Sequence, residues 1–215
     1  MKNKNYKINE EFFNEWSNDM AYILGFTTTD GCITDDNRLS YGLNSKDRHV
    51  LDFISSKICP GRDIKISEEK RKNTICSCAR LRIGSKYLCC QLKKLGIVPR
   101  KTGKEALPEI PDKYKHDYLR GLFDGDGSIH ITNKSNNQLT FQICSASKSF
   151  LEDIKFKIGG NTGYIKYKGK NCWTWIVYKQ CDILNLYKYM YKTKSFYLLR
   201  KKTKFEEGRI ICQKY

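Results

Sequence analysis

The 215-residue chain lacks the residue patterns that build zinc sites, disulfide frameworks and membrane spans. It contains three histidines, and its ten cysteines form no C-x2-C pair, which argues against a zinc site. The cysteines are also scattered, so we interpret them as small core side chains in a reducing compartment. No apolar run approaches the length of a membrane span, and residues 1–13 lack the apolar core of a signal peptide. We expect an intracellular protein of the cytoplasm, an organelle or a nucleoid, neither secreted nor bound to a membrane.

Proline is scarce as well, and three of the four prolines lie between residues 99 and 111. Such a cluster is typical of a linker. The expected organisation is therefore a first half at residues 1–98, a linker at 99–112, and a second half at 113–215 with a basic C-terminal tail. Halves of about 100 residues are long enough to bury a core.

Acidic residues are too few to balance the basic ones. Lysine and arginine total 40 against 23 aspartate and glutamate residues, which gives a formal net charge of +17. On a chain with 13% aromatic residues, this charge indicates nucleic acid as the partner, because basic side chains that contact phosphates release counterions. A basic membrane-surface protein is the alternative, but no amphipathic basic helix of the right kind stands out.

One pattern of twelve residues occurs twice: residues 22–33 read YILGFTTTDGCI and residues 118–129 read YLRGLFDGDGSI. Both copies begin with apolar residues at helical spacing and end in Asp-Gly followed by a strand-like isoleucine. We therefore expect helices over residues 14–29 and 113–125 that stop at Gly31 and Gly127. A repeat of this kind predicts a chain with internal two-fold symmetry.

Small residues four positions apart lie on one face of each predicted helix. They are Gly25 and Thr29 in the first copy, and Gly121 and Gly125 in the second. A face of small residues lets another backbone come close, and the natural partner of each face is the other one. The sequence thus predicts that the two helices pack on each other.

The aspartates of the two Asp-Gly pairs, Asp30 and Asp126, would then arrive side by side at the ends of the helices. That placement is costly, because two carboxylates repel each other and a helix C-terminus is itself partly negative. A divalent cation would offset the repulsion, and Mg²⁺ suits oxygen ligands of this kind. A hairpin turn and a helix pair with incidental aspartates are the alternatives. A calcium loop is excluded, because Ile129 and Ser135 stand where glycine and glutamate are needed.

These two stretches resemble the two motifs of a single-chain LAGLIDADG homing endonuclease. Residues 119–127 match the motif closely, whereas residues 23–31 are looser and carry Thr28 where the second copy has Asp124. The resemblance implies an α+β fold of two pseudo-symmetric αββαββα halves that pack through their motif helices. It also implies a monomer whose antiparallel sheets form a DNA-binding saddle over a long, pseudo-palindromic site.

The same resemblance implies site-specific cleavage of double-stranded DNA across the minor groove, by metal-dependent phosphodiester hydrolysis that leaves short 3′ overhangs. Mg²⁺ is the implied cofactor, with Mn²⁺ as a substitute and Ca²⁺ supporting binding without cleavage. One acid and one lysine serve each half, and a backbone carbonyl helps each acid to hold the metal. The implied catalytic residues are Asp30, Asp126, Lys101 and Lys194, with Lys192 competing for the last role, and the implied metal ligands are Asp30, Asp126, Thr29 and Gly125.

Strand-like stretches in both halves alternate apolar and polar residues, as expected of antiparallel sheets with one face on the core. The polar faces are rich in Arg, Asn and Gln, which read base edges in the major groove. On pattern alone a solvated sheet face is an equal alternative, and the family resemblance favours DNA contact. The predicted DNA-contacting residues are Arg38, Asn44, Lys65, Arg80, Arg82, His130, Thr132, Gln138, Thr140, Gln142 and Lys166.

Two other functions stay open. Some proteins with this scaffold are RNA maturases that help an intron to splice, which makes intron RNA a second candidate partner. Another class is a DNA-binding regulator that has lost cleavage, although both motif aspartates are present here. The chain lacks the splicing-type termini of an intein, which favours a freestanding or intron-encoded protein.

Overall fold

The structure is a computed structural model that describes residues 7–71, 74–133, 138–193 and 195–212. Its first series of elements is α1 (Asn18–Asp30), β1 (Gly31–Ile33), β2 (Arg38–Asn44), α2 (Arg48–Ile58), β3 (Lys65–Arg71), β4 (Thr74–Gly84) and α3 (Lys86–Lys94). Its second series is α4 (Lys115–Asp126), β5 (Gly127–Asn133), β6 (Gln138–Ser145), α5 (Lys148–Lys157), β7 (Tyr164–Gly169), β8 (Cys172–Val177) and α6 (Gln180–Met190). A last helix is α7 (Leu199–Cys212), and short 3-10 helices are η1 (Glu10–Phe13), η2 (Ser45–Asp47) and η3 (Asp112–Tyr114). The predicted αββαββα order is confirmed in both series.

Each series contributes one four-stranded antiparallel sheet, with strand orders β1-β2-β4-β3 and β5-β6-β8-β7. Strand β2 shows why these sequences form two-faced sheets. Its Leu39, Tyr41 and Leu43 are buried on one face, whereas Arg38 and Asn44 are exposed on the other. Helices α2 and α3 pack on this sheet, so one face is left for a partner.

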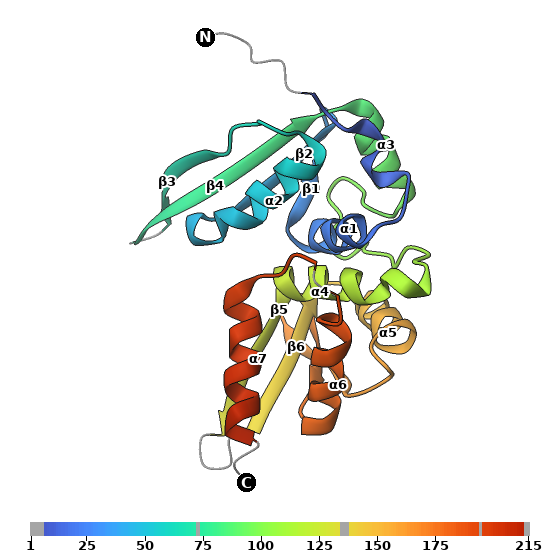
Figure 1. Ribbon diagram of the computed structural model, residues 1–215, viewed down its shortest axis with the longest axis vertical. Coiled ribbons are helices and arrows are strands. Elements are labelled where there is room, and N and C mark those ends of the chain that lie inside the picture. The colour runs from blue at the N-terminus through green and yellow to red at the C-terminus, as the bar shows by residue number, and fades with distance from the viewer. Residues whose placement is uncertain (1–6, 72–73, 134–137, 194, 213–215) are drawn as a thin grey trace. The chain divides into compact units, whose positions relative to one another are not determined.

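By packing, the chain divides into two compact units: residues 1–16 with 30–100, and residues 17–29 with 101–215. Almost all of α1 therefore packs within the second unit, although it precedes the first sheet in the chain. Helix α7 lies along β5 in that unit (Figure 1). Its Phe205 joins the core, with its ring centroid 5.2 Å from that of Phe123 and 6.2 Å from that of Phe141.

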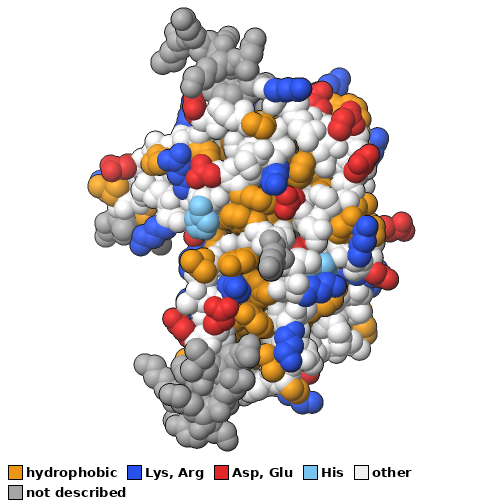
Figure 2. Space-filling model, viewed as in Figure 1, with side chains coloured by type: hydrophobic (Ala, Val, Ile, Leu, Met, Phe, Trp, Pro, Cys, Tyr) orange, Lys and Arg blue, Asp and Glu red, His pale blue; other side chains and the backbone are white. Residues whose placement is uncertain are grey.

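The charge of the chain is not gathered into a single patch on the face seen in Figure 2. Blue lysine and arginine side chains are interspersed there with red acidic ones. The excess of basic residues is therefore not visible as one continuous surface on this face. Among the described residues, no helix is long and apolar enough to cross a membrane.

Helices α1 and α4 touch backbone to backbone. A Cβ atom on Gly25 would lie 2.2 Å from the carbonyl oxygen of Tyr118, and one on Gly121 would lie 2.1 Å from that of Tyr22. Only glycine fits such a contact, because any side chain would overlap the facing backbone. The Tyr22 hydroxyl also donates to the carboxylate of Asp124 at 2.9 Å. The predicted packing through small residues is confirmed.

Both motif helices stop where the sequence indicated, at Asp30 and Asp126, and a strand begins at the next residue. The pattern Asp-Gly indicated that each glycine ends its helix as a C-terminal cap, and this explanation was wrong. Neither Gly31 nor Gly127 has the positive φ of a glycine helix cap, and Gly127 is extended at φ −85°. Glycine is required at 127 because a Cβ there would lie 2.5 Å from the carbonyl oxygen of Phe123. The chain passes so close to the preceding turn that no side chain fits.

Replacing Gly121 with alanine should destabilise the protein, although alanine is the better helix former by about 1 kcal/mol. The added Cβ meets the Tyr22 carbonyl, so we expect the free energy of unfolding in urea to fall by about 1–3 kcal/mol. Gly42→Ala is the control, because a Cβ at that position has nothing within 4 Å. Equal stability of the two variants would contradict the close helix contact.

Candidate functional site

A lysine lies at the C-terminal end of the first motif helix. Lys101, in the segment after α3, donates from Nζ to the carbonyl oxygen of Thr29 at 2.8 Å. A turn positions it, since the Lys104 amide donates to the Lys101 carbonyl at 2.7 Å and Gly103 adopts φ 80°. The last carbonyls of a helix lack partners within the helix and carry partial negative charge, so an ammonium group is well placed here.

Lys201 of α7 occupies the corresponding place at the end of α4. It is buried, with 6% of its surface exposed. Its Nζ lies 2.7–2.9 Å from four backbone carbonyl oxygens, those of Phe123, Asp124, Gly125 and Gly127. Because an ammonium group has three protons, these acceptors share its donors, and the charge is fixed at the helix end.

Lys201 was missed in the sequence analysis, which assigned the second lysine to Lys194. Lys194 lies outside the described residues. A signal for Lys201 exists in the sequence, because Arg-Lys occurs at residues 100–101 and again at 200–201. The same offset relates Leu51 in α2 to Leu151 in α5. The correspondence of Lys201 with Lys101 is not visible from the spacing after the preceding helix, because a longer segment separates α6 from Lys201 than separates α3 from Lys101.

The carboxylate of Asp126 lies within the electrostatic influence of both lysines. It is exposed at the end of α4, yet partial loss of water around it raises its pKa. The positive charges of Lys101 and then Lys201 oppose this rise, and the negative charge of Glu105 adds to it. Asp30, the last residue of α1, is half-buried. Each motif helix thus ends in a carboxylate, and Asp126 has ammonium groups as neighbours.

These side chains fit a divalent cation only in part. The carboxylates of Asp30 and Asp126 are suitable hard ligands. The carbonyls of Thr29 and Gly125, which were expected to assist them, accept hydrogen bonds from Lys101 and Lys201, and each oxygen has a second lone pair. Within the described ranges, no three His, Cys, Asp or Glu side chains are grouped so that they could hold a metal ion. A bound cation would therefore draw its remaining ligands from water and substrate phosphate.

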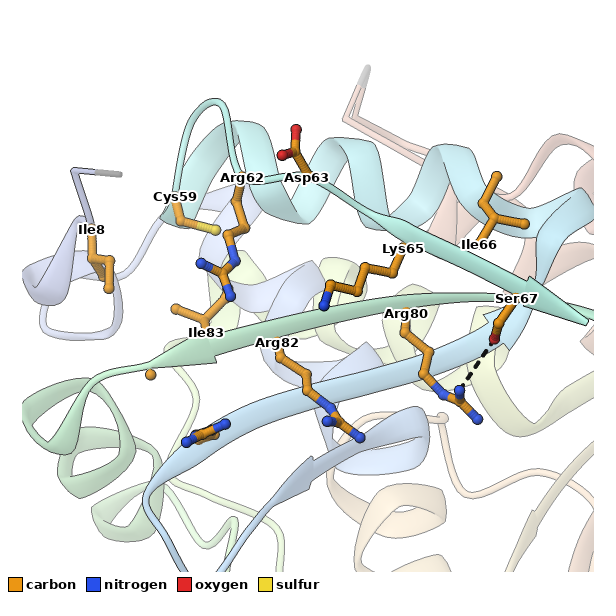
Figure 3. Close-up of a pocket in the computed structure, with 12 residues that line it drawn as sticks. Ile8, Cys59, Arg62, Asp63, Lys65, Ile66, Ser67, Arg80, Arg82 and Ile83 are labelled. Atoms are coloured by element: carbon orange, nitrogen blue, oxygen red, sulfur yellow. Dashed lines mark hydrogen bonds between the residues drawn. The ribbon is translucent and has the colours of Figure 1, made fainter. Parts of the chain in front are cut away.

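A basic groove follows the polar face of the first sheet. It has a volume of about 740 Å³, and its lining includes Arg38, Lys65, Arg80 and Arg82 (Figure 3). These four side chains alternate along β2, β3 and β4 with residues that face the helices. The structure therefore brings together four of the five DNA-contacting residues that the sequence analysis predicted for this sheet.

The basic side chains of the groove differ in how they are held. Arg80 forms an ion pair with Glu69 and donates to the Ser67 hydroxyl at 3.2 Å (Figure 3). In the part of the chain that the structure describes, Lys65 and Arg82 form no ion pair. Arg80 is thus fixed in direction, as base recognition requires, whereas Lys65 and Arg82 are available to phosphates.

The polar side chains at the two ends of β2 are held by contacts with residues close in sequence. Arg38 pairs with Asp36 at 2.8 Å. A hydrogen bond from the Thr34 hydroxyl, and then the charge of Arg38, lower the pKa of Asp36. Asn44, the fifth predicted contact, is exposed, but its side chain accepts from the Lys46 amide at 3.0 Å and caps η2.

The polar face of the second sheet is less charged. The predicted contacts that are exposed or half-buried on it are His130, Gln138, Gln142 and Lys166. Thr140 is 3% exposed, so it is covered by its neighbours. Thr132 belongs to β5, but its side chain lies outside the described part of the structure.

Two tyrosines on this face were missed. Tyr164 of β7 and Tyr178, which follows β8, are 39% and 40% exposed, and their ring centroids lie 5.3 Å apart. Strand alternation places Tyr164 on the same side as Lys166, which was the available signal.

Comparison with known proteins adds family evidence for the second half of the chain. Residues 113–190 match the family model described as a LAGLIDADG-like domain. The stretch from α4 to α6 is thus similar to a LAGLIDADG-like domain. A comparison with curated protein sequences gave no significant match.

Solved structures extend the similarity to nearly the whole chain. The chain resembles the meganuclease I-SmaMI bound to uncleavable DNA with a TTGT central four, at TM-score 0.57 and 16% identity, covering 93% of this chain and 88% of that chain. It resembles the LAGLIDADG meganuclease I-AabMI bound to uncleaved DNA, at TM-score 0.56 and 15% identity, covering 89% of each chain. It also resembles the N-terminal LAGLIDADG domain of WhiA, at TM-score 0.53 and 15% identity, covering 87% of this chain and 89% of that domain.

At these identities the similarity shows the fold, which is the α+β LAGLIDADG meganuclease fold with two four-stranded antiparallel sheets. Another I-SmaMI structure holds an uncleaved DNA target in the presence of calcium ions. The fold is therefore shared by DNA-bound meganucleases and by a domain that is not named as a nuclease.

Lys201→Met should destabilise the protein far more than Lys101→Met. The first change leaves four backbone carbonyls, most of them buried, without their ammonium partner, and the second leaves one. We expect a loss of about 3 kcal/mol or more for Lys201→Met and about 1 kcal/mol for Lys101→Met. Urea unfolding of the two variants measures the difference, and equal losses would contradict the placement of Lys201.

Proposed function

We propose that this protein is a site-specific DNA endonuclease that hydrolyses phosphodiester bonds with the help of a divalent metal ion. The observation that carries the proposal is the geometry at the ends of the motif helices, where Lys101 Nζ binds the Thr29 carbonyl at 2.8 Å and Lys201 Nζ binds the Gly125 carbonyl at 2.9 Å. Each of these carbonyls lies one residue before a motif aspartate, so each helix end combines a carboxylate that can hold a metal ion with an ammonium group that can attract a phosphate. The LAGLIDADG meganuclease fold, with neighbours bound to DNA, supports the same conclusion.

The aspartates and lysines of the site have different proposed roles: the aspartates bind the metal ion, and the lysines stabilise negative charge on the phosphate. When bound, a divalent ion such as Mg²⁺ supplies an activated water at neutral pH and stabilises charge on the leaving oxygen. Asp126 would hold one such ion at the end of α4, and Asp30 would hold one at the end of α1. Lys101 and Lys201 would offset the charge that develops on the phosphate, because ammonium groups fixed before the reaction need no reorganisation during it. We propose one carboxylate and one lysine for each DNA strand, within a monomer.

The sheet faces would supply recognition. On the first sheet Arg80, which Glu69 and Ser67 hold in one direction, suits guanine, whose two major-groove acceptors match a guanidinium fork. On the second sheet Gln138 and Gln142 suit adenine, which presents one donor and one acceptor. We therefore propose a long, pseudo-palindromic target whose two half-sites differ in composition. Cleavage across the minor groove with short 3′ overhangs belongs to the same proposal.

The proposal is tested by incubating the purified protein with a randomised duplex DNA library and Mg²⁺, with EDTA as the control, and sequencing the ends. Discrete metal-dependent ends with short 3′ overhangs at one long site are expected. Selective retention of DNA without new ends would instead favour a DNA-binding regulator. If neither is seen, selective binding of a structured intron RNA would favour a maturase.

Asp126→Asn should retain specific DNA binding and abolish double-strand cleavage. The amide keeps the shape of the side chain but lacks the charge that a divalent ion requires. Asp30→Asn should behave likewise on the other strand. Gel-shift binding and strand-labelled cleavage of the selected target measure both properties. Substantial cutting of both strands by Asp126→Asn would overturn the metal-binding role of the carboxylate.

Removal of Lys65 or Arg82 should weaken binding to duplex DNA of any sequence and flatten its salt dependence. Each phosphate contact contributes about 0.9 to the slope of log affinity against log salt, so each alanine variant should lower that slope by about 1. Lys94→Ala is the matched control, because Lys94 is exposed on α3, away from the groove. An unchanged slope in the Lys65 and Arg82 variants would remove the groove from the interface.

A further inference from the structure

The buried carboxylate of Asp124 holds the start of α7. One oxygen, Oδ2, accepts from the backbone amide of Leu198 at 2.8 Å and from the Tyr22 hydroxyl at 2.9 Å. Leu198 immediately precedes α7, and its carbonyl accepts from the Lys201 amide at 3.0 Å in the first turn. An acidic side chain that binds a free amide at a helix start is a favourable cap.

Helix α7 in turn places a lysine on the backbone of the residue that caps it. Lys201 lies three positions after Leu198, and its Nζ contacts the carbonyl oxygens of Asp124 and Gly125 at 2.8 and 2.9 Å. The Asp124 side chain therefore fixes the backbone from which Lys201 extends, and the Lys201 side chain binds the backbone of Asp124. Further along α7, Phe205 packs 5.2 Å from Phe123 and anchors the rest of the helix.

The first motif lacks this arrangement. Thr28 stands at the matching position, and its hydroxyl bonds to the Leu24 carbonyl at 2.9 Å and lies 3.1 Å from the Tyr118 hydroxyl. These partners belong to the motif helices and not to the segment that carries Lys101. The two lysines thus reach similar places by different means, one from a turn and the other from a helix capped by a buried acid.

We propose that Asp124 is a positioning residue for the second half-site: by capping α7 it sets Lys201 at the end of α4. The proposal rests on the proposed endonuclease function and assigns α7 to the cleavage of one DNA strand. The other strand depends on Lys101 and is independent of Asp124.

The first experiment measures the position of Lys201 without any DNA. Acetylation by acetic anhydride, followed by peptide mass spectrometry, compares the reactivity of Lys201 and Lys101 in the wild type, Asp124→Thr and Asp124→Asn. Asp124→Thr places the residue of the first motif in the second, so its hydroxyl bonds within α4 and leaves the Leu198 amide free. Asp124→Asn keeps an acceptor oxygen, and its amide nitrogen can take the place of Oδ1, which has no hydrogen-bond partner in the described structure.

A hydrogen bond to a charged group contributes enough free energy that its loss should shift the equilibrium between the protected and the exposed Lys201 ammonium group about tenfold or more. Lys201 should therefore become at least about tenfold more reactive in Asp124→Thr and remain protected in Asp124→Asn, with Lys101 unchanged in both. Continued protection of Lys201 in Asp124→Thr would overturn the proposal. Thermal unfolding confirms that each variant is folded, and Asp124→Ala replaces Asp124→Thr if the latter is not.

The second experiment follows strand-specific nicking of the DNA target recovered from the randomised library. Asp124→Thr should slow one strand at least about tenfold and leave the other unchanged, while Asp124→Asn restores the affected strand. Thr28→Val is the matched control in the first motif. Equal slowing of both strands would indicate general destabilisation and contradict the proposal. If the wild type cuts neither strand, the endonuclease proposal fails, whereas the lysine reactivity still decides whether Asp124 positions Lys201.

Discussion

The contact between the backbones of α1 and α4 is the constraint on which the rest of the site depends. Gly25 and Gly121 each lie against a carbonyl of the facing helix, so neither helix can slide or rotate without a clash. This contact fixes the ends of both helices, and Asp126 is the last residue of α4. The positions of the lysines then follow, because Lys101 and Lys201 bind carbonyls at those ends.

The fold could be predicted from the sequence because its information is local and repeated. The alternation in β2, the helical spacing of the motif stretches and the recurrence of the whole pattern each indicate an element without tertiary knowledge. The explanation for Gly127 failed for the opposite reason. Its requirement comes from the nearness of the Phe123 carbonyl, which sequence spacing does not reveal, and not from a backbone angle.

Site residues that lie in the motif or in the strands could be predicted from the sequence, whereas a residue that reaches the site from a distant part of the sequence was missed. Asp126 ends the motif helix itself, and the groove arginines follow from strand alternation. Lys201 belongs to α7, which follows the repeated elements, so its contact with the Gly125 carbonyl is hard to predict from spacing near the motif, although Arg-Lys recurs at residues 100–101 and 200–201. Thr140 shows the converse, since alternation puts it on the polar face while neighbouring side chains bury it.

The two halves are alike in topology and unlike in electrostatics, and this difference bears on how a pseudo-symmetric scaffold would meet the proposed target, whose half-sites differ in composition. A homodimer must present the same groups to both half-sites, whereas a single chain with an internal repeat can change one half alone. Here the first sheet has arginines, one of them directed by Glu69, and the second has amides and tyrosines. The lysines differ in the same way, since one is held by a turn and the other by a capped helix. Such divergence preserves the glycine contact, because that contact involves backbone and leaves the surrounding side chains free to vary.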